Sequence, residues 1–232
     1  MLITYIHHSC FSIETENSIL LFDYYKGNIP NFTKEKPLFV FSSHFHQDHF
    51  NPVIFELSEK YPDVTYILSK DIRLKELNRE NYNIITMGKN ESITIKDSLK
   101  VDTLRSTDEG VAFLISEKGT TFYHAGDLNW WVWKDDTTSE YNNMTKNFKD
   151  EINKISGKEI DLAFLPLDPR QEELYSLGFD YFMQNTRTSV AFPMHFWLDY
   201  SIIEKFKNSE EASIYKDRII DISFEGQTFQ ID

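Results

Sequence analysis

Cysteine and histidine are both scarce in this chain of 232 residues, which contains one Cys and seven His. The single cysteine, Cys10, excludes a disulfide within the chain. This agrees with a reducing compartment, and we expect a cytoplasmic protein. The first residues hold neither a basic segment nor a small-residue cleavage site, so we expect no export signal.

Long apolar runs and excess basic charge are also lacking. No uncharged apolar run approaches the roughly 20 residues that span a membrane. The 24 Lys and Arg residues stand against 37 Asp and Glu residues, and the formal net charge is −13. Nucleic-acid binding relies on Lys and Arg to neutralise phosphates, so this balance disfavours it. We expect a small-molecule substrate and no membrane partner, and leave a homo-oligomer open.

Linkers are missing as well, since no Pro-, Gly- or Ser-rich stretch divides the chain. We therefore predict a single domain over residues 1–232. Strand patterns alternate with helix patterns, which predicts an α/β protein with two mixed sheets packed face to face and helices outside. The predicted strands are 2–6, 10–14, 18–23, 38–42, 66–68, 84–87, 92–95, 99–104, 111–116, 120–124, 161–167, 189–194, 219–224 and 228–231, and the predicted helices are 52–61, 72–77, 142–155, 171–183 and 199–207.

Three of the seven histidines fall in one turn, where residues 44–49 read His-Phe-His-Gln-Asp-His. The turn follows the apolar run at 38–42 and precedes Asn51-Pro52, which predicts a strand, a rigid turn and then a helix. Neutral imidazole and carboxylate groups are ligands for zinc or a similar divalent ion. A polar loop that happens to be rich in histidine is the alternative. The predicted metal ligands in this turn are His44, His46, Asp48 and His49.

Two later strands also end beside a metal-ligating residue. Asp127 follows the strand predicted at 120–124, and His195 follows the strand predicted at 189–194. Strand ends at one edge of a layered sheet can converge on a point. Taken alone, Asp127 resembles a turn residue and His195 a core histidine. Together with the turn at 44–49, both are predicted metal ligands.

These ligands give the chain a resemblance to the metallo-β-lactamase superfamily over nearly its whole length. The segments at 6–11 and 20–23 are similar to the start of the small UlaG-like branch. The resemblance implies a four-layer αββα sandwich with two adjacent divalent metals at the sheet edge. We expect one or two ions, zinc first and manganese or iron as alternatives. The implied division is His44 and His46 for the first metal, Asp48, His49 and His195 for the second, and Asp127 bridging both.

The resemblance also implies a third histidine for the first metal, between the turn and Asp127. No histidine occurs from residue 50 to 123, and the corresponding stretch is 105–110. Asp108 in this stretch could donate a carboxylate instead, which manganese or iron accepts more readily than zinc. An ordinary turn residue is the alternative. His124 lies on the strand before Asp127, where a packing role is expected.

Further candidates surround these ligands. By the resemblance, His8 faces the site, and Asp23 orients a ligand histidine from behind. A satisfied edge histidine and a strand-end turn residue are the alternatives. Arg170 could bind an anionic substrate group, although pairing with Asp168 is the commoner arrangement. The remaining candidates are Trp130, Trp131 and Trp133, which could form a substrate wall, a subunit contact or plain core.

These features predict a metal-dependent hydrolase of a small ester, lactone or phosphoester. A metal-bound water is acidic enough to supply hydroxide at neutral pH. Asp48 is the predicted catalytic residue, because it would anchor the attacking hydroxide as well as bind metal. Redox chemistry at two irons, which the superfamily also hosts, is a second enzyme class. The resemblance implies Glu at the position of His46 in that branch, so His46 argues against it. The alternative from another class is a non-catalytic sensor or interaction domain with a degraded metal site.

Overall fold

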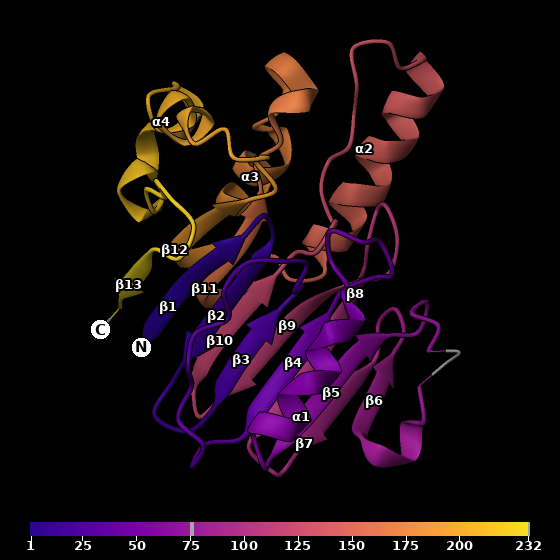
Figure 1. Cartoon of the computed structure of the whole chain (residues 1–232). Helices are drawn as coiled ribbons and strands as arrows, with labels where there is room; N and C mark the ends of the chain where they lie inside the picture. The colour runs from indigo at the N-terminus through magenta and orange to yellow at the C-terminus, as the bar shows by residue number, and fades with distance from the viewer. Residues whose placement is uncertain (75–76, 232) are drawn as a thin grey trace. The chain divides into compact units, whose positions relative to one another are not determined.

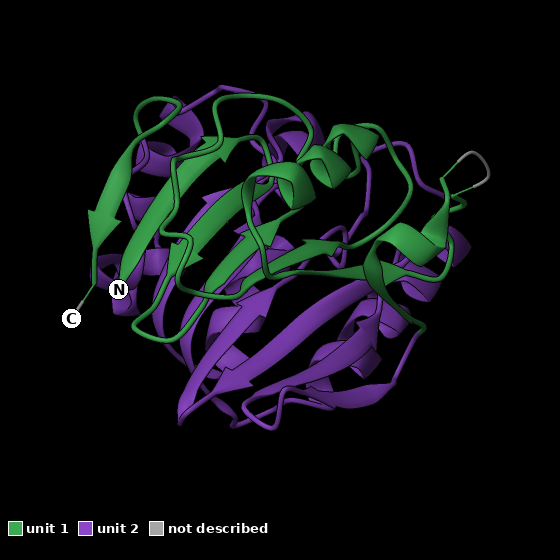
Figure 2. Cartoon of the chain, turned by 60° about the horizontal axis from the view of Figure 1, so that its bottom comes forward, with its two compact units in different colours: residues 1–88, 223–232 green, residues 89–222 purple. Residues whose placement is uncertain are grey.

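The computed structural model of the chain describes residues 1–74 and 77–231. The chain divides into two compact units, one of residues 1–88 and 223–232 and the other of residues 89–222 (Figure 2). Each unit contains one mixed sheet together with helices, so the predicted α/β class is confirmed. The single domain over residues 1–232 stays a prediction.

Unit 1, residues 1–88 and 223–232, is built on a seven-stranded sheet in the order β13-β1-β2-β3-β4-β5-β6 (Figure 1). Strands β3 to β6 run parallel, whereas β13, β1, β2 and β3 pair antiparallel. Apolar residues of η1 and α1 share a buried core with β3, β4 and β5. The elements are β1 (Leu2–His7), β2 (Cys10–Glu14), β3 (Ile19–Phe22), β4 (Leu38–Ser42), η1 (Pro52–Glu56), α1 (Leu57–Lys60), β5 (Val64–Ser69), η2 (Arg79–Asn81), β6 (Asn83–Met87) and β13 (Thr228–Gln230).

Unit 2, residues 89–222, is built on a six-stranded sheet in the order β12-β11-β10-β9-β8-β7. Strands β10, β11 and β12 are parallel, and β7 to β10 pair antiparallel. The elements are β7 (Ser92–Ile95), β8 (Leu99–Arg105), β9 (Val111–Glu117), β10 (Thr120–His124), α2 (Thr138–Asn153), β11 (Glu159–Pro166), η3 (Pro169–Leu174), α3 (Leu177–Asn185), β12 (Arg187–Met194), α4 (Ser201–Lys207), η4 (Glu211–Ile214) and η5 (Lys216–Arg218).

Strand direction places the candidate residues of each unit at one sheet edge. In unit 1, β1, β3 and β4 end at the same edge, because β1 and β3 are both antiparallel to β2 and β4 is parallel to β3. In unit 2, β8, β10, β11 and β12 likewise end at one edge. The residues that follow these strands are therefore neighbours within their unit.

Two predicted elements are wrong. The expected helix at 72–77 is not seen at residues 72–74 and 77, which are not helical, while residues 75 and 76 lie outside the described part. The expected strand at 219–224 is reduced to one bridge between Ala191 and Ile219. Strand β13 pairs instead with β1, with Thr228 opposite Thr4. No helix in the described ranges is long and apolar enough to cross a membrane.

Candidate metal centre

The ligand-rich turn is held by its own backbone. Strand β4 is buried along its whole length and delivers the chain to His44. The amides of His49 and Phe50 both donate to the carbonyl of His46, at 3.0 and 2.9 Å. Asn51 then accepts from the Val53 amide at 3.1 Å and caps η1, where Pro52 needs no amide partner. The strand and the capped helix fix both ends of the turn, as the sequence predicted.

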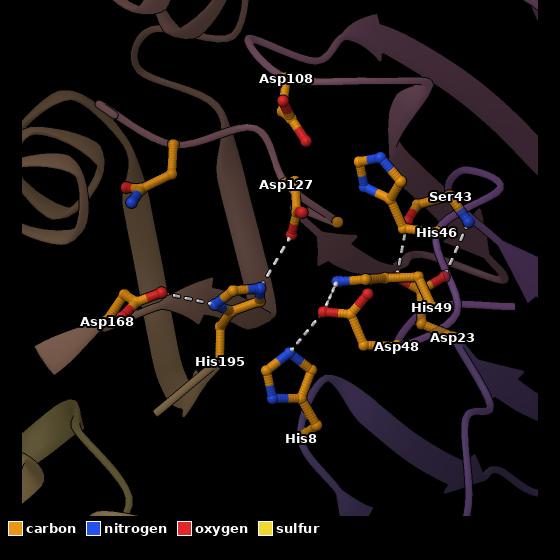
Figure 3. Close-up of polar contacts among 12 residues, drawn as sticks. His8, Asp23, Ser43, His46, Asp48, His49, Asp108, Asp127, Asp168 and His195 are labelled. Carbon is orange, nitrogen blue, oxygen red and sulfur yellow. Dashed lines mark hydrogen bonds and ion pairs between the residues drawn. The ribbon is translucent and has the colours of Figure 1, made fainter. Parts of the chain in front are cut away.

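A single buried carboxylate orients the turn from behind (Figure 3). Asp23 follows β3, and its Oδ1 accepts from the Ser43 amide at 2.7 Å. Its Oδ2 accepts from the Ser43 hydroxyl at 2.7 Å and lies 2.8 Å from Nδ1 of His49. The carboxylate fixes the proton of His49 on Nδ1, which presents Nε2 as a lone-pair donor. Asp23 therefore has the orienting position that the resemblance implied.

Ser43 extends this arrangement to a second histidine. Its Oγ lies 2.9 Å from Nδ1 of His44. Because the hydroxyl proton is donated to Asp23, Nδ1 of His44 must be the donor to Ser43, and its Nε2 presents a lone pair. Nε2 of His44 lies 3.0 Å from Nδ1 of His46. Zinc–nitrogen distances of about 2.0–2.1 Å allow two nitrogens on one ion to lie this close.

A second cluster in unit 1 joins His8, Asp48 and His49. Their potential ligand atoms all lie within 4.8 Å of one another. Oδ2 of Asp48 is 3.4 Å from Nε2 of His8 and 3.8 Å from Nε2 of His49. Burial would raise the pKa of Asp48, but the His8 hydrogen bond and the nearby His49 outweigh burial and lower this pKa well below its usual range. The cluster thus offers two imidazoles and a charged carboxylate.

In unit 2, His195 lies between two carboxylates at the ends of β10, β11 and β12 (Figure 3). Its Nε2 is 3.5 Å from Oδ1 of Asp127, and its Nδ1 is 2.9 Å from Oδ2 of Asp168. Burial would raise the pKa of Asp168, but hydrogen bonds from His195 and Arg170 lower it to about 2. Asp168 therefore orients His195 as Asp23 orients His49.

Arg170 pairs with Asp168, as the sequence favoured. Its Nε lies 2.9 and 3.0 Å from the two carboxylate oxygens, and Nη2 also donates to Oδ2. Asp168 in turn caps η3 by accepting from the Arg170 amide at 2.9 Å. The positive charge of this arginine is thus matched by a buried carboxylate. This local neutralisation argues against Arg170 as a binding group for an anionic substrate.

The loop in which a third histidine was expected is tied to the segment after Asp127. The Thr107 hydroxyl donates to the carbonyl of Asn129 at 2.6 Å and accepts from the Asn129 amide at 3.1 Å. Asp108 is exposed, and one of its carboxylate oxygens lies within 4.8 Å of one from Asp127. This position fits Asp108 as a substitute ligand. His124 is buried and accepts from the Gly126 amide at 3.2 Å, which agrees with a packing role.

The tryptophan run divides between core and site. Trp130 is buried and stacks on Phe148 of α2 at 5.9 Å, so it belongs to the core. Trp131 contacts the site instead, because its indole Nε1 donates to the Asp127 carbonyl at 2.8 Å and its ring lies edge-on to His195. Trp133 stacks on Trp131.

Backbone strain falls on the same residues. His8, Asp23 and His195 adopt φ values of 54°, 44° and 62°, in the left-handed region that residues other than glycine rarely occupy. Each costs about 1–3 kcal/mol and persists only where the surroundings enforce it, which is typical of functional sites. The strain therefore supports these strand ends as functional positions, each within its own unit.

The donor chemistry fits a divalent cation. Unit 1 presents His8 with Asp48 and His49, and separately His44 with His46; unit 2 presents Asp127 with His195 and with Asp108. The sequence did not identify Ser43 or the orienting role of Asp168. A polar residue directly after a buried strand was the available signal for both.

Comparison with known proteins places these residues in context. The family described as the beta-lactamase superfamily domain matches residues 2–137. No curated protein matches the chain. Igni18, described as a metallo hydrolase from Ignicoccus hospitalis, is similar in structure with a TM-score of 0.67 and 18% identity, covering 100% of this chain and 99% of that chain. YhfI from Bacillus subtilis, described as a metallo-beta-lactamase fold protein, has a TM-score of 0.65 and 14% identity, and the match covers 99% of this chain and 99% of that chain.

A third similar structure is an isothiocyanate hydrolase from Delia radicum gut bacteria. Its TM-score is 0.59 at 15% identity, and the match covers 100% of this chain and 99% of that chain. At such identities these likenesses establish the fold. The metallo-β-lactamase fold inferred from the sequence is confirmed, while the UlaG-like branch stays a prediction.

Proposed function

Since the family match covers more than half of its residues, the chain belongs to the beta-lactamase superfamily, and we propose that it is a metal-dependent hydrolase of a small molecule. One observation supports this most strongly. Two buried carboxylates, Asp23 and Asp168, fix the Nδ1 atoms of His49 and His195, so each histidine presents Nε2 as a metal ligand. A carboxylate on the second ring nitrogen is typical of histidines that bind metal.

The ligand set follows the family resemblance. We propose that Asp127 and His195 serve the same one or two ions as the histidine turn, with Asp127 bridging when two ions bind. His8 joins this proposal because of its distance to Asp48. Asp108 replaces the missing histidine of the first metal. The proposed metal-binding residues are His8, His44, His46, Asp48, His49, Asp108, Asp127 and His195.

Metal identity follows from ligand chemistry. A set with several imidazoles suits zinc, whereas a carboxylate such as Asp108 in place of a histidine shifts the preference towards manganese or iron. We propose zinc for the cluster of His8, Asp48 and His49, and a weaker, carboxylate-rich first site. A bound divalent ion supplies Lewis acidity and lowers the pKa of water to about 7.

Asp48 is the proposed catalytic residue. Its lowered pKa keeps the carboxylate charged at neutral pH. A charged carboxylate accepts a hydrogen bond from the attacking water and orients it towards the scissile bond. The low pKa makes Asp48 a weak base, so positioning is the larger part of its contribution. We propose a small ester, lactone or phosphoester as substrate.

Activity assays test the proposal. The metal-loaded protein should hydrolyse generic chromogenic esters or phosphodiesters. Asp127→Asn keeps the shape of the side chain and removes its charge, so kcat should fall at least 100-fold, similar to the loss when one group that stabilises the transition state of a hydrolytic enzyme is removed. Glu109→Ala, a change at an exposed neighbour of Asp108, is the matched control. Full activity in Asp127→Asn would contradict the proposal, and metal binding without any turnover would favour the sensor alternative.

A further inference from the structure

Four apolar residues that follow Asp127 or His195 closely in the sequence are not explained by metal binding. Trp133, Trp197 and Leu198 are 38%, 45% and 47% exposed, and Trp131 is half-buried. Large side chains of this kind are normally covered, and clustered exposure marks a binding surface. The residues come from two segments of unit 2, one after β10 and one after β12.

The rings hold a defined arrangement. Trp131 and Trp133 stack with centroids 6.2 Å apart and planes 9° from parallel. The His195 ring contacts the indoles of Trp131 and Trp197 edge-on, with ring centroids 5.5 and 5.6 Å apart. Two of the indoles, those of Trp131 and Trp197, therefore lie directly beside His195, a proposed metal ligand.

The polar atoms of two indoles face inwards. Nε1 of Trp131 donates to the Asp127 carbonyl at 2.8 Å, and Nε1 of Trp197 donates to Asp168 at 3.4 Å. These bonds leave apolar ring surface for contact with a ligand. Arg170 lies 4.8 Å over the Trp197 ring, and its charge is matched by Asp168. The arginine that lies against the Trp197 ring is therefore itself paired with a carboxylate.

Backbone strain is concentrated in one of the two segments of the cluster. His195, Trp197 and Leu198 have φ values of 62°, 50° and 65°. Three left-handed residues other than glycine within four positions are rare, and such strain is concentrated at ligand clamps.

The loop that carries Trp131 and Trp133 is held by hydrogen bonds to Gln171. Gln171 donates from Nε2 to the carbonyls of Trp130 and Val132, at 2.9 and 3.2 Å. Its Oε1 accepts from Asn129 at 3.0 Å. A braced loop keeps Trp131 and Trp133 in place before any ligand arrives, which reduces the ordering cost of binding.

We propose that Trp131, Trp133, Trp197 and Leu198 form a subsite for a flat, uncharged aromatic group of the substrate. A flat ring extends the offset stack of the two indoles and gains dispersion contact that a puckered ring cannot match. The acidic chain and the neutralised Arg170 disfavour an anionic group. This proposal rests on the proposed hydrolase function and names its substrate class as aryl esters and related aryl compounds.

Binding to metal-free protein tests the subsite separately from catalysis. The probes are 2-naphthamide, cyclohexanecarboxamide and 2-naphthoate, titrated by calorimetry and ligand-observed NMR. We expect 2-naphthamide to bind at least tenfold more tightly than the other two. Trp133→Ala and Trp197→Ala should each raise its Kd at least fivefold, and Trp133→Phe should restore most of the affinity. Phe224→Ala changes another exposed aromatic residue and should have no effect.

The outcomes are distinct. Equal binding of the flat and puckered amides, or an unchanged Kd in Trp133→Ala with its near-ultraviolet circular dichroism retained, overturns the subsite. A dimer in light scattering that Trp133→Ala dissociates also overturns it, because a second copy then covers the surface. Failure of the proposed function would show instead as absent metal and absent hydrolysis, while 2-naphthamide still bound.

Discussion

Oδ2 of Asp23 lies 2.8 Å from Nδ1 of His49, and both side chains are completely buried. The same carboxylate accepts hydrogen bonds from the amide and the hydroxyl of Ser43, whose Oγ contacts His44. One aspartate thus orients two histidines of the turn, one directly and one through Ser43.

Replacing Asp23 should therefore weaken metal binding. Asp23→Asn keeps the size of the side chain but places an amide where His49 and Ser43 both need an acceptor. We expect metal affinity to fall about 10–100-fold, as for other residues that orient metal ligands. Competition with a chromogenic chelator measures this change. Ser43→Ala removes the hydroxyl that joins Asp23 to His44 but keeps the contact between Asp23 and His49, so it should cost less. A larger loss in Ser43→Ala than in Asp23→Asn would contradict the arrangement.

Asp108 should control the second equivalent of metal. Asp108→Ala removes the proposed substitute ligand, and the metal content should fall by one ion per chain where two had bound. Asp108→His supplies an imidazole in its place and should raise the preference for zinc over manganese, because imidazole suits zinc. Metal analysis after loading with each ion measures both effects. Unchanged stoichiometry and selectivity in both variants would remove Asp108 from the site.

The stability of the protein at alkaline pH should depend on the buried Tyr123. Burial, and then Glu151, raise the pKa of Tyr123, so the native state keeps this proton after the unfolded chain loses its own near pH 10. Stability from this group is present below pH 10 and falls above it by about 1.4 kcal/mol per pH unit. Tyr123→Phe should flatten this loss in urea unfolding measured from pH 8 to 11.

At pH 7 the same variant should be neutral or more stable by about 1 kcal/mol, because Tyr123 Oη is buried with no partner in the described part of the chain. Tyr215→Phe is the contrast, since the Tyr215 hydroxyl donates to Asp180 at 2.6 Å and its loss should cost about 1 kcal/mol. A destabilised Tyr123→Phe would show that this hydroxyl has a partner in solution.

Parts of the fold and site could be predicted from local pattern. The predicted strand at 38–42 has the same bounds as the observed β4, because five successive apolar or small side chains are buried between polar turns. The turn at 44–49 was predicted because histidine is rare elsewhere. Ser43 was missed because its role depends on the register of β3 against β4, which places Phe22 opposite Phe41.

Long-range pairing explains the wrong strand at 219–224. Residues 220–224 alternate apolar and polar side chains, as a strand does, but of the predicted segment 219–224 only Ile219 bridges to a neighbouring strand. Strand β13 pairs with β1 from the opposite end of the sequence, where no local signal exists. The local sequence indicates only that Asp168 caps η3. Its second partner, His195, is 27 residues away, so this pairing has no local signal.

The central claim is that the oriented histidines bind a divalent metal, and elemental analysis of the protein purified without added metal tests it most directly. We expect at least one transition-metal ion per chain, lost in His49→Ala and retained in Glu109→Ala. A chain that holds no metal under any loading condition, or a His49→Ala variant that retains all of it, would contradict the claim.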